Sequence, residues 1–114
     1  MRLPNAEAAI IAQAKMREYL LAANHPEGGS KAGFFLAVGF HPDHWPLLAD
    51  AIREMIGITP VTQTVESRHG TKYIVEGNLV TPTARRVHVR TVWIIEPGES
   101  TPRFVTAYPL EDEP

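Results

Sequence analysis

Hydrophobic positions in the first half of the chain recur at the three- and four-residue spacing of amphipathic helices. One such segment covers about residues 13–23, a second and almost wholly apolar one covers residues 31–38, and a third covers residues 42–57. The third is the most regular, and its apolar members are Trp45, Leu48, Ala49, Ile52, Met55 and Ile56. Gly57 stands where a glycine commonly ends a helix. The pattern therefore predicts about three helices, and we expect Trp45 to be part of the core.

The second half of the chain changes to the two-residue alternation of β-strands. Alternating segments cover residues 61–66, 72–80, 86–96 and 103–108, and short stretches of turn-forming residues separate them. Short connections favour antiparallel pairing of successive strands. The sequence therefore predicts a single α+β domain, in which about three N-terminal helices pack on a four-stranded antiparallel meander sheet. We expect a helical part over residues 1–57, the sheet over residues 58–109 and an acidic tail over residues 110–114.

One short apolar run lies outside these elements. Ala9, Ile10 and Ile11 could form a brief strand or the first turn of a helix, and periodicity does not separate the two in so short a stretch.

The third predicted strand carries the most informative polar pattern of the chain. Alternation places Arg86, His88 and Arg90 on one face of the strand and Thr91 and Trp93 on the other. Guanidinium groups bind phosphate oxygens, and an imidazole can transfer a proton near neutral pH. This row indicates a polyanion site if it faces solvent, and we expect it on the face of the sheet that the helices leave open.

The composition of the whole chain hides a local excess of positive charge. The chain has 114 residues, a formal net charge of −2 and no cysteine. The segment from Arg68 to Arg90 nevertheless holds five Lys or Arg residues, two His and one acid, Glu76. A local positive field of this kind attracts anionic partners. Because a long apolar run and a signal-peptide pattern are both missing, we expect a cytoplasmic protein without a membrane association, with secretion as a toxin left open.

Three further groups are candidates for chemistry. His25 and Lys31 flank the predicted start of a helix, where backbone N–H groups favour an anion. His41 and His44 resemble a metal-ligand pair, but their spacing matches no strong motif, so capping or surface roles are favoured and no metal is expected. Thr106 and Tyr108 share one face of the fourth strand. Their hydroxyls, and that of Thr91 on the third strand, could bind phosphate oxygens or orient a base, although a wall of the core is the favoured interpretation of Tyr108.

Four segments together resemble a bacterial family of small domains of unknown function. They are LPNAEAAII with KMREYLL, HPEGGSKAGFF, KYIVEGNLVTP and VRTVWIIEPGESTPRFVTAYP. This resemblance covers nearly the whole chain, from Leu3 to Pro109. It implies helices before a sheet and brings no established activity.

A weaker resemblance, at the level of the fold, is to the RNase toxin superfamily that includes barnase, the tRNA-cleaving colicins and RelE-like toxins. It implies a site of His, Lys or Arg with a late Ser or Thr on the sheet face. The candidates here, in chain order, are His25 or Lys31, then His88 with Arg86 or Arg90, then Thr106. The resemblance also implies a small acidic protein as a neutralising partner.

Two functions remain in competition at this point. The first is a metal-independent endoribonuclease of toxin type that acts on RNA phosphodiesters without a cofactor. In it, His25, His88 and Thr106 are catalytic, and Lys31, Arg86 and Arg90 bind phosphate. The alternative is a non-catalytic binding or immunity-type module, which uses the basic sheet face or a sheet edge to bind RNA or a protein partner.

Overall fold

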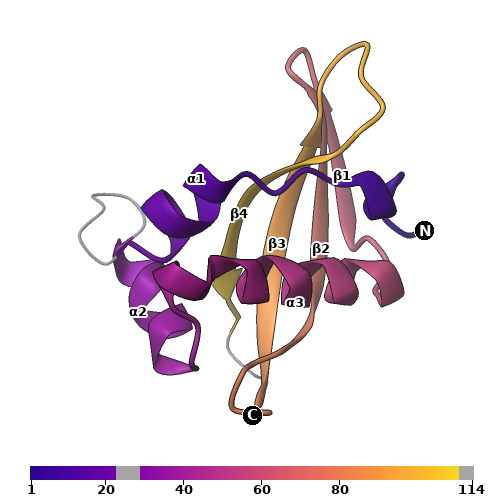
Figure 1. Cartoon of the computed structure of the whole chain (residues 1–114). Coiled ribbons are helices and arrows are strands. Elements are labelled where there is room, and N and C mark those ends of the chain that lie inside the picture. The colour runs from indigo at the N-terminus through magenta and orange to yellow at the C-terminus, as the bar shows by residue number, and fades with distance from the viewer. Residues whose placement is uncertain (23–28, 111–114) are drawn as a thin grey trace.

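Helices cover one face of a four-stranded antiparallel sheet, and strands in chain order are neighbours in the sheet. The computed structural model (Figure 1) describes residues 1–22 and 29–110, with the side chains of all of these except Gly29 and Ser30. The strands are β1 (Gln63–Ser67), β2 (Gly70–Val80), β3 (Arg86–Ile95) and β4 (Arg103–Pro109). The predicted α+β class and the meander order are confirmed. The acidic residues 111–113 and the candidate His25 lie outside the described residues.

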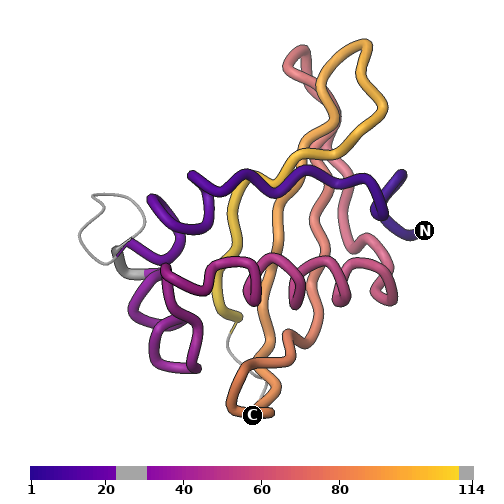
Figure 2. Tube along the Cα trace, in the orientation of Figure 1, coloured from indigo at the N-terminus to yellow at the C-terminus, as the bar shows by residue number. Residues whose placement is uncertain are grey.

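The helical half is more broken than its hydrophobic pattern indicates. It contains η1 (Ala6–Ala8), α1 (Gln13–Lys15), η2 (Met16–Leu20), α2 (Gly29–Ala37), η3 (Pro42–His44) and α3 (Trp45–Ile58). The η2 segment is a π-helical turn, closed by a 2.8 Å hydrogen bond from the N–H of Leu21 to the carbonyl of Met16. Such wide turns are frequent at functional sites. Figure 2 follows this path along the Cα trace.

The helix α3 forms one wall of the core, as its pattern predicts. Leu48, Ile52 and Ile56 are fully buried, and Trp45 packs against the same core while remaining partly exposed. The prediction that Gly57 ends the helix is wrong. The helix continues to Ile58 and ends at Thr59, which precedes Pro60 and is extended, because a residue before proline avoids the helical region.

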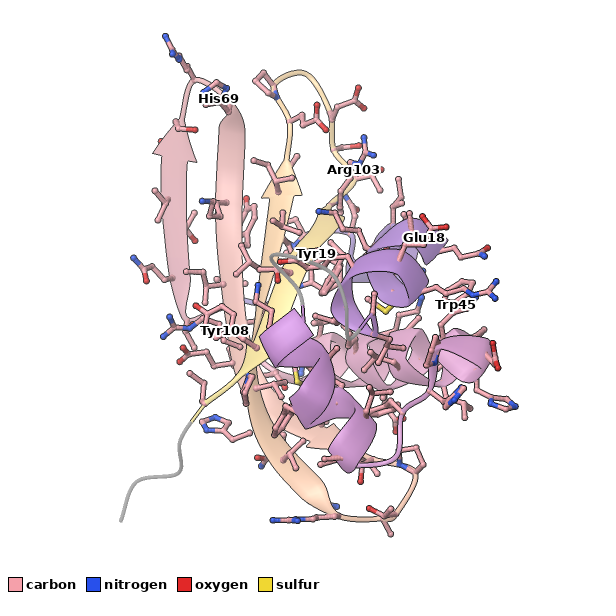
Figure 3. All side chains as sticks on the ribbon, turned by 90° about the vertical axis from the view of Figure 1, so that its left-hand side faces the viewer. Glu18, Tyr19, Trp45, His69, Arg103 and Tyr108 are labelled. Carbon is pink, nitrogen blue, oxygen red and sulfur yellow. The ribbon has the colours of Figure 1, made fainter. Side chains whose placement is uncertain are left out.

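The two faces of the sheet differ in what covers them. Val75, Leu79, Val89 and Trp93 are fully buried on the face that meets the helices. Thr91 is buried on the same face, where it accepts a 2.9 Å hydrogen bond from Nε1 of Trp93 and donates a 3.0 Å hydrogen bond to the carbonyl of Val75. No helix within residues 1–22 and 29–110 packs across the other face, called the open face below, as the rotated view in Figure 3 shows.

The N-terminal segment covers part of the β4 edge. The N–H of Ile10 donates a 2.9 Å hydrogen bond to the carbonyl of Pro102, and the N–H of Phe104 donates a 2.9 Å hydrogen bond to the carbonyl of Ile10. Ile10 therefore forms a parallel bridge to Arg103. Residues 9–11 are therefore not the first turn of a helix, and Ile10 pairs like a strand residue in a single isolated bridge.

Within residues 1–22 and 29–110, none of the helices combines the length and the apolar character that a membrane span requires.

Candidate functional site on the open face of the sheet

The predicted basic row lies on the open face. Arg86, His88 and Arg90 of β3 lie opposite Val80, Asn78 and Glu76 of β2, so alternation carries all six side chains to one side. Arg86 is exposed, whereas His88 and Arg90 are half-buried. The row is therefore accessible from solvent, but its three members are not equivalent.

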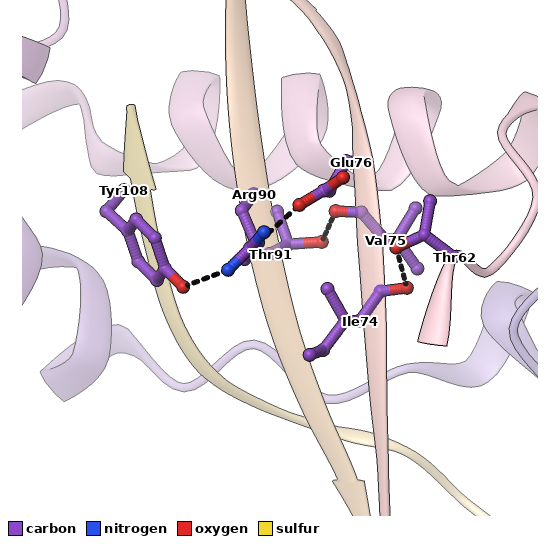
Figure 4. A network of polar contacts seen from close by, with 7 residues as sticks. All are labelled: Thr62, Ile74, Val75, Glu76, Arg90, Thr91 and Tyr108. Atoms are coloured by element: carbon purple, nitrogen blue, oxygen red, sulfur yellow. Dashed lines mark hydrogen bonds and ion pairs between the residues drawn. The ribbon is translucent and has the colours of Figure 1, made fainter. Parts of the chain in front are cut away.

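Arg90 is held by two neighbours on the same face. Its Nε donates to Oε2 of Glu76 in an ion pair, and its Nη1 donates a 3.0 Å hydrogen bond to the hydroxyl of Tyr108 (Figure 4). The hydrogen bonds to Tyr108 and to Glu76 raise the pKa of Arg90 above its ordinary value. Arg90 is therefore a fixed, permanently charged group whose charge Glu76 partly compensates.

Lys31 reaches the open face from α2 and joins two hydroxyl groups. Its Nζ donates hydrogen bonds of 2.7 Å to the hydroxyl of Tyr19 and 3.0 Å to Oγ1 of Thr106. The same ammonium lies 5.9 Å from the ring centroid of Tyr108, and Cζ of Arg90 lies 5.6 Å from that centroid. Tyr108 therefore stands between the two cations.

The π-helical turn η2 places Tyr19 beside β4, the edge strand of the sheet, and Figure 3 labels Tyr19 there. Its hydroxyl lies 3.4 Å from Oγ1 of Thr106, and Nζ of Lys15 lies 5.2 Å from its ring centroid. Burial raises the pKa of Tyr19. The hydrogen bonds with Lys31 and Thr106, together with the charges of Lys31 and Lys15, outweigh burial and lower the pKa below its ordinary value. Tyr19 is therefore a readier proton donor than an ordinary tyrosine.

These residues form one cluster, called the tyrosine–cation cluster below. Its members are Tyr19, Lys31, Glu76, Arg90, Thr106 and Tyr108. Of the residues predicted from the sequence, the structure brings together Lys31, Arg90 and Thr106. His88 lies on the same face two residues before Arg90, about 7 Å along the strand. Arg86 lies two residues before His88, at the start of β3, and is farther from the cluster. His25 lies outside the described residues.

Sequence reasoning missed Tyr19, Glu76 and Tyr108. The interpretation of Tyr108 as a wall of the core is wrong, because Tyr108 pairs with Arg90 across the strands and shares the open face with it. Tyr19 fitted the apolar stripe of its helix and gave no polar signal. The one available signal was the lone acid Glu76 in the basic segment.

Of the two histidines near η3, His41 caps a helix and His44 is exposed at the surface without a side-chain capping bond, and both are roles that the sequence favours. Nδ1 of His41 accepts a 3.1 Å hydrogen bond from the backbone N–H of Asp43, which caps the start of η3. In the part of the chain that the structure describes, three or more His, Asp or Glu side chains do not gather in a metal-binding arrangement.

The fold defines a class of protein, a small α+β domain with helices on one face of an antiparallel sheet and a polar cluster on the other. The chain belongs to the family described as Domain of unknown function DUF6883, whose sequence profile matches residues 2–111. This confirms the predicted family of small domains of unknown function.

The solved structures that share the fold include one from a toxin–immunity complex. It is a chain of the "Contact-dependent growth inhibition toxin - immunity protein complex from Klebsiella pneumoniae 342", with a TM-score of 0.73 and 12% sequence identity over 94% of this chain and 97% of that chain. At this identity the likeness concerns the fold alone. A search of curated proteins finds no match.

Proposed function

We propose that this domain is a metal-independent ribonuclease of toxin type, with its active site at the tyrosine–cation cluster. The observation that carries the proposal is the meeting of Lys31, Thr106 and Tyr19 within hydrogen-bond distance on an open sheet face, next to Arg90. Fixed cations and hydroxyls at one point suit an anion that gains charge in the transition state. The shared fold with a chain of a toxin–immunity complex adds support for a role in such a system, as toxin or as immunity protein.

The reaction would be an internal transesterification. The 2′-oxygen of a ribose attacks the adjacent phosphorus, the bond from phosphorus to the 5′-oxygen breaks, and a 2′,3′-cyclic phosphate forms. His88 or His25 takes the proton of the 2′-hydroxyl. Tyr19 gives a proton to the leaving 5′-oxygen, because its lowered pKa favours release. No metal or outside reactant is needed for this balance.

The cations have separate tasks in this proposal. The ammonium group of Lys31 has three N–H donors. Among the described residues, Tyr19 and Thr106 accept from two of them, so the third can donate to a phosphate oxygen. Glu76 and Tyr108 contact Nε and Nη1 of Arg90, so in this proposal Nη2 also donates to a phosphate oxygen. Arg86 binds the RNA backbone further along β3, and Thr106 orients the bound phosphate.

The test is cleavage of a labelled single-stranded RNA by the purified chain in the presence of EDTA. Lys31→Gln should lower the cleavage rate by about 100-fold or more, a loss of the size seen when one oxyanion donor is removed. Lys72→Gln is the matched control, because Lys72 lies on the open face of β2, outside the cluster, and it should leave the rate within about twofold. The product should carry a 2′,3′-cyclic phosphate.

A binding module is the second candidate, favoured by the ion pair between Glu76 and Arg90, which holds this guanidinium in place without any ligand. Salt-sensitive RNA binding without cleavage by the wild-type chain would establish this second function and overturn the first. Equal cleavage by the wild type and by Lys31→Gln would place the active site elsewhere. A small acidic protein that covers the cluster remains the proposed neutralising partner.

A further inference from the structure

The edge of the sheet opposite the tyrosine–cation cluster is only half covered. β1 pairs with β2 from Gln63 opposite Ile74 to Ser67 opposite Gly70, and β2 then continues to Val80 without β1 beside it. Figure 1 shows β2 running on toward the turn that leads to β3. The last six residues of β2 therefore form an edge of the sheet.

The backbone of this edge points outward at every second residue. The carbonyl of Ile74 accepts a 2.8 Å hydrogen bond from the N–H of Thr62 on the β1 side. Alternation then directs the N–H and C=O groups of Glu76, Asn78 and Val80 to the same side. In residues 1–22 and 29–110 these groups have no backbone partner on that side. Such a row is a template for one more strand.

A hollow with an apolar rim follows this edge. It has a volume of about 360 Å³ and lies between the end of α3 (Met55, Ile58) and the free part of β2 (Gly77, Asn78, Val80). Ile58 is 73% exposed and Val80 is 49% exposed, which is unusual for side chains of this type. A second hollow, between Leu47 and Val80, adjoins the first. Apolar side chains of an added strand would find partners here.

The charge at this edge favours an acidic occupant. Arg86 lines the hollow on the open-face side, and Arg85 precedes it in the turn from β2. Both are exposed, and no described carboxylate lies within ion-pair distance of either. Glu54 is the one acid among the described residues that line the hollow, and it comes from α3, on the other face of the sheet. An acidic side chain on the open-face side would therefore meet the uncompensated guanidinium group of Arg86.

We propose that the free edge of β2 binds an extended segment of an acidic protein partner, which adds to the sheet as a strand. Residues in that segment alternate between the two faces. Apolar residues face α3 and pack against Ile58, and acidic residues face the open side beside Arg86. The surface shares with the tyrosine–cation cluster only Glu76, which contributes its backbone here and its carboxylate there, so this proposal does not depend on ribonuclease activity.

The test uses a synthetic peptide as the probe, acetyl-Val-Glu-Val-Glu-Val-amide, titrated into the ¹⁵N-labelled full chain and followed by NMR. The backbone amide signals of Glu76, Asn78 and Val80 should shift. The peptide with Lys in place of Glu should bind about tenfold more weakly, equivalent to about 1.4 kcal/mol. N-methylation of every backbone amide of the peptide keeps each side chain and removes all of its strand hydrogen-bond donors, whichever way the strand runs, and it should abolish the shifts.

Variants of the chain locate the site. Ile58→Asn should weaken binding about tenfold, whereas Val65→Asn, at a residue 41% exposed on β1, should not. Arg86→Gln should remove the preference for the acidic peptide, and Arg68→Gln should keep it. Absence of binding, or shifts confined to the outer edge of β1, would overturn the proposal. So would a dimer in sedimentation that Ile58→Asn dissociates, because the occupant would then be a second copy of the chain.

Discussion

Lys31 donates a 2.7 Å hydrogen bond to the hydroxyl of Tyr19, and this contact joins α2 to the π-helical turn η2. The same ammonium group donates a 3.0 Å hydrogen bond to Oγ1 of Thr106 in β4. Twelve residues separate Tyr19 from Lys31, and Thr106 is 75 residues beyond Lys31. The site thus exists only where the two halves of the chain meet.

The first prediction concerns the pKa of Tyr19. Lys31→Met removes a hydrogen bond and a positive charge that stabilise the phenolate, so the pKa of Tyr19 should rise. Ultraviolet titration of the phenolate measures it, and comparison with Tyr19→Phe assigns its signal among the three tyrosines. Lys15→Met removes a charge without a hydrogen bond and should raise the pKa less. A titration curve that Lys31→Met leaves unchanged would contradict the electrostatic role of Lys31.

The second prediction concerns stability against pH. The native pKa of Tyr19 is lowered, so the unfolded chain binds more protons than the native one between that pKa and the ordinary tyrosine value of about 10. Within this window the wild type should gain stability with rising pH, relative to Tyr19→Phe. The gain should be complete above the window and absent below it. Urea unfolding of both proteins at several pH values measures the difference, and parallel curves would count against the lowered pKa.

The third prediction concerns the buried Thr91. Thr91→Val leaves the indole N–H of Trp93 without its acceptor in the core, which should cost about 1–3 kcal/mol. Thr91→Ser keeps the hydroxyl and should cost less, about the value of one buried methyl group. Denaturant unfolding measures both variants. A larger loss in Thr91→Ser than in Thr91→Val would mean that the methyl group, rather than the hydroxyl, is the more stabilising part of this side chain.

The fourth prediction compares two glycines with positive φ. Gly70 has φ 122°, and a Cβ there would overlap the carbonyl oxygen of Ile95 and lie 2.9 Å from Cα of Glu96. Gly98 has φ 81° and open space around it. Gly98→Ala should therefore cost about 1–3 kcal/mol for the strained backbone alone. Gly70→Ala should cost more, because β2 must also move away from β3, and the melting temperatures of the two variants test this order.

The fold was largely predictable because its signals are local. The alternation in residues 86–95 and the helical spacing in residues 45–58 each appear within one element. Gly57 misled because a C-terminal glycine is only a tendency, whereas the proline after Thr59 forbids helix at that residue. The four strands were therefore found, while the end of α3 was placed too early.

The site was predictable only in part because its contacts are not local. Alternation shows that Thr106 and Tyr108 share a face, but which face the helices cover depends on packing between distant elements. Tyr19 approaches Thr106 across 87 residues, and no periodicity in one segment reports such a contact. The cations Lys31 and Arg90 could be named from charge alone, whereas the tyrosine between them required the three-dimensional arrangement.

The bridge between Ile10 and the residues that begin β4 has a consequence for how the molecule is assembled. Its two hydrogen bonds join Ile10 to a strand that the ribosome synthesises more than ninety residues later. Pairings of such long sequence separation form late in folding. Neither this bridge nor the contact of Lys31 with Thr106 can form before β4 has been synthesised, so a growing chain holds none of this chemistry until the ribosome has passed Thr106.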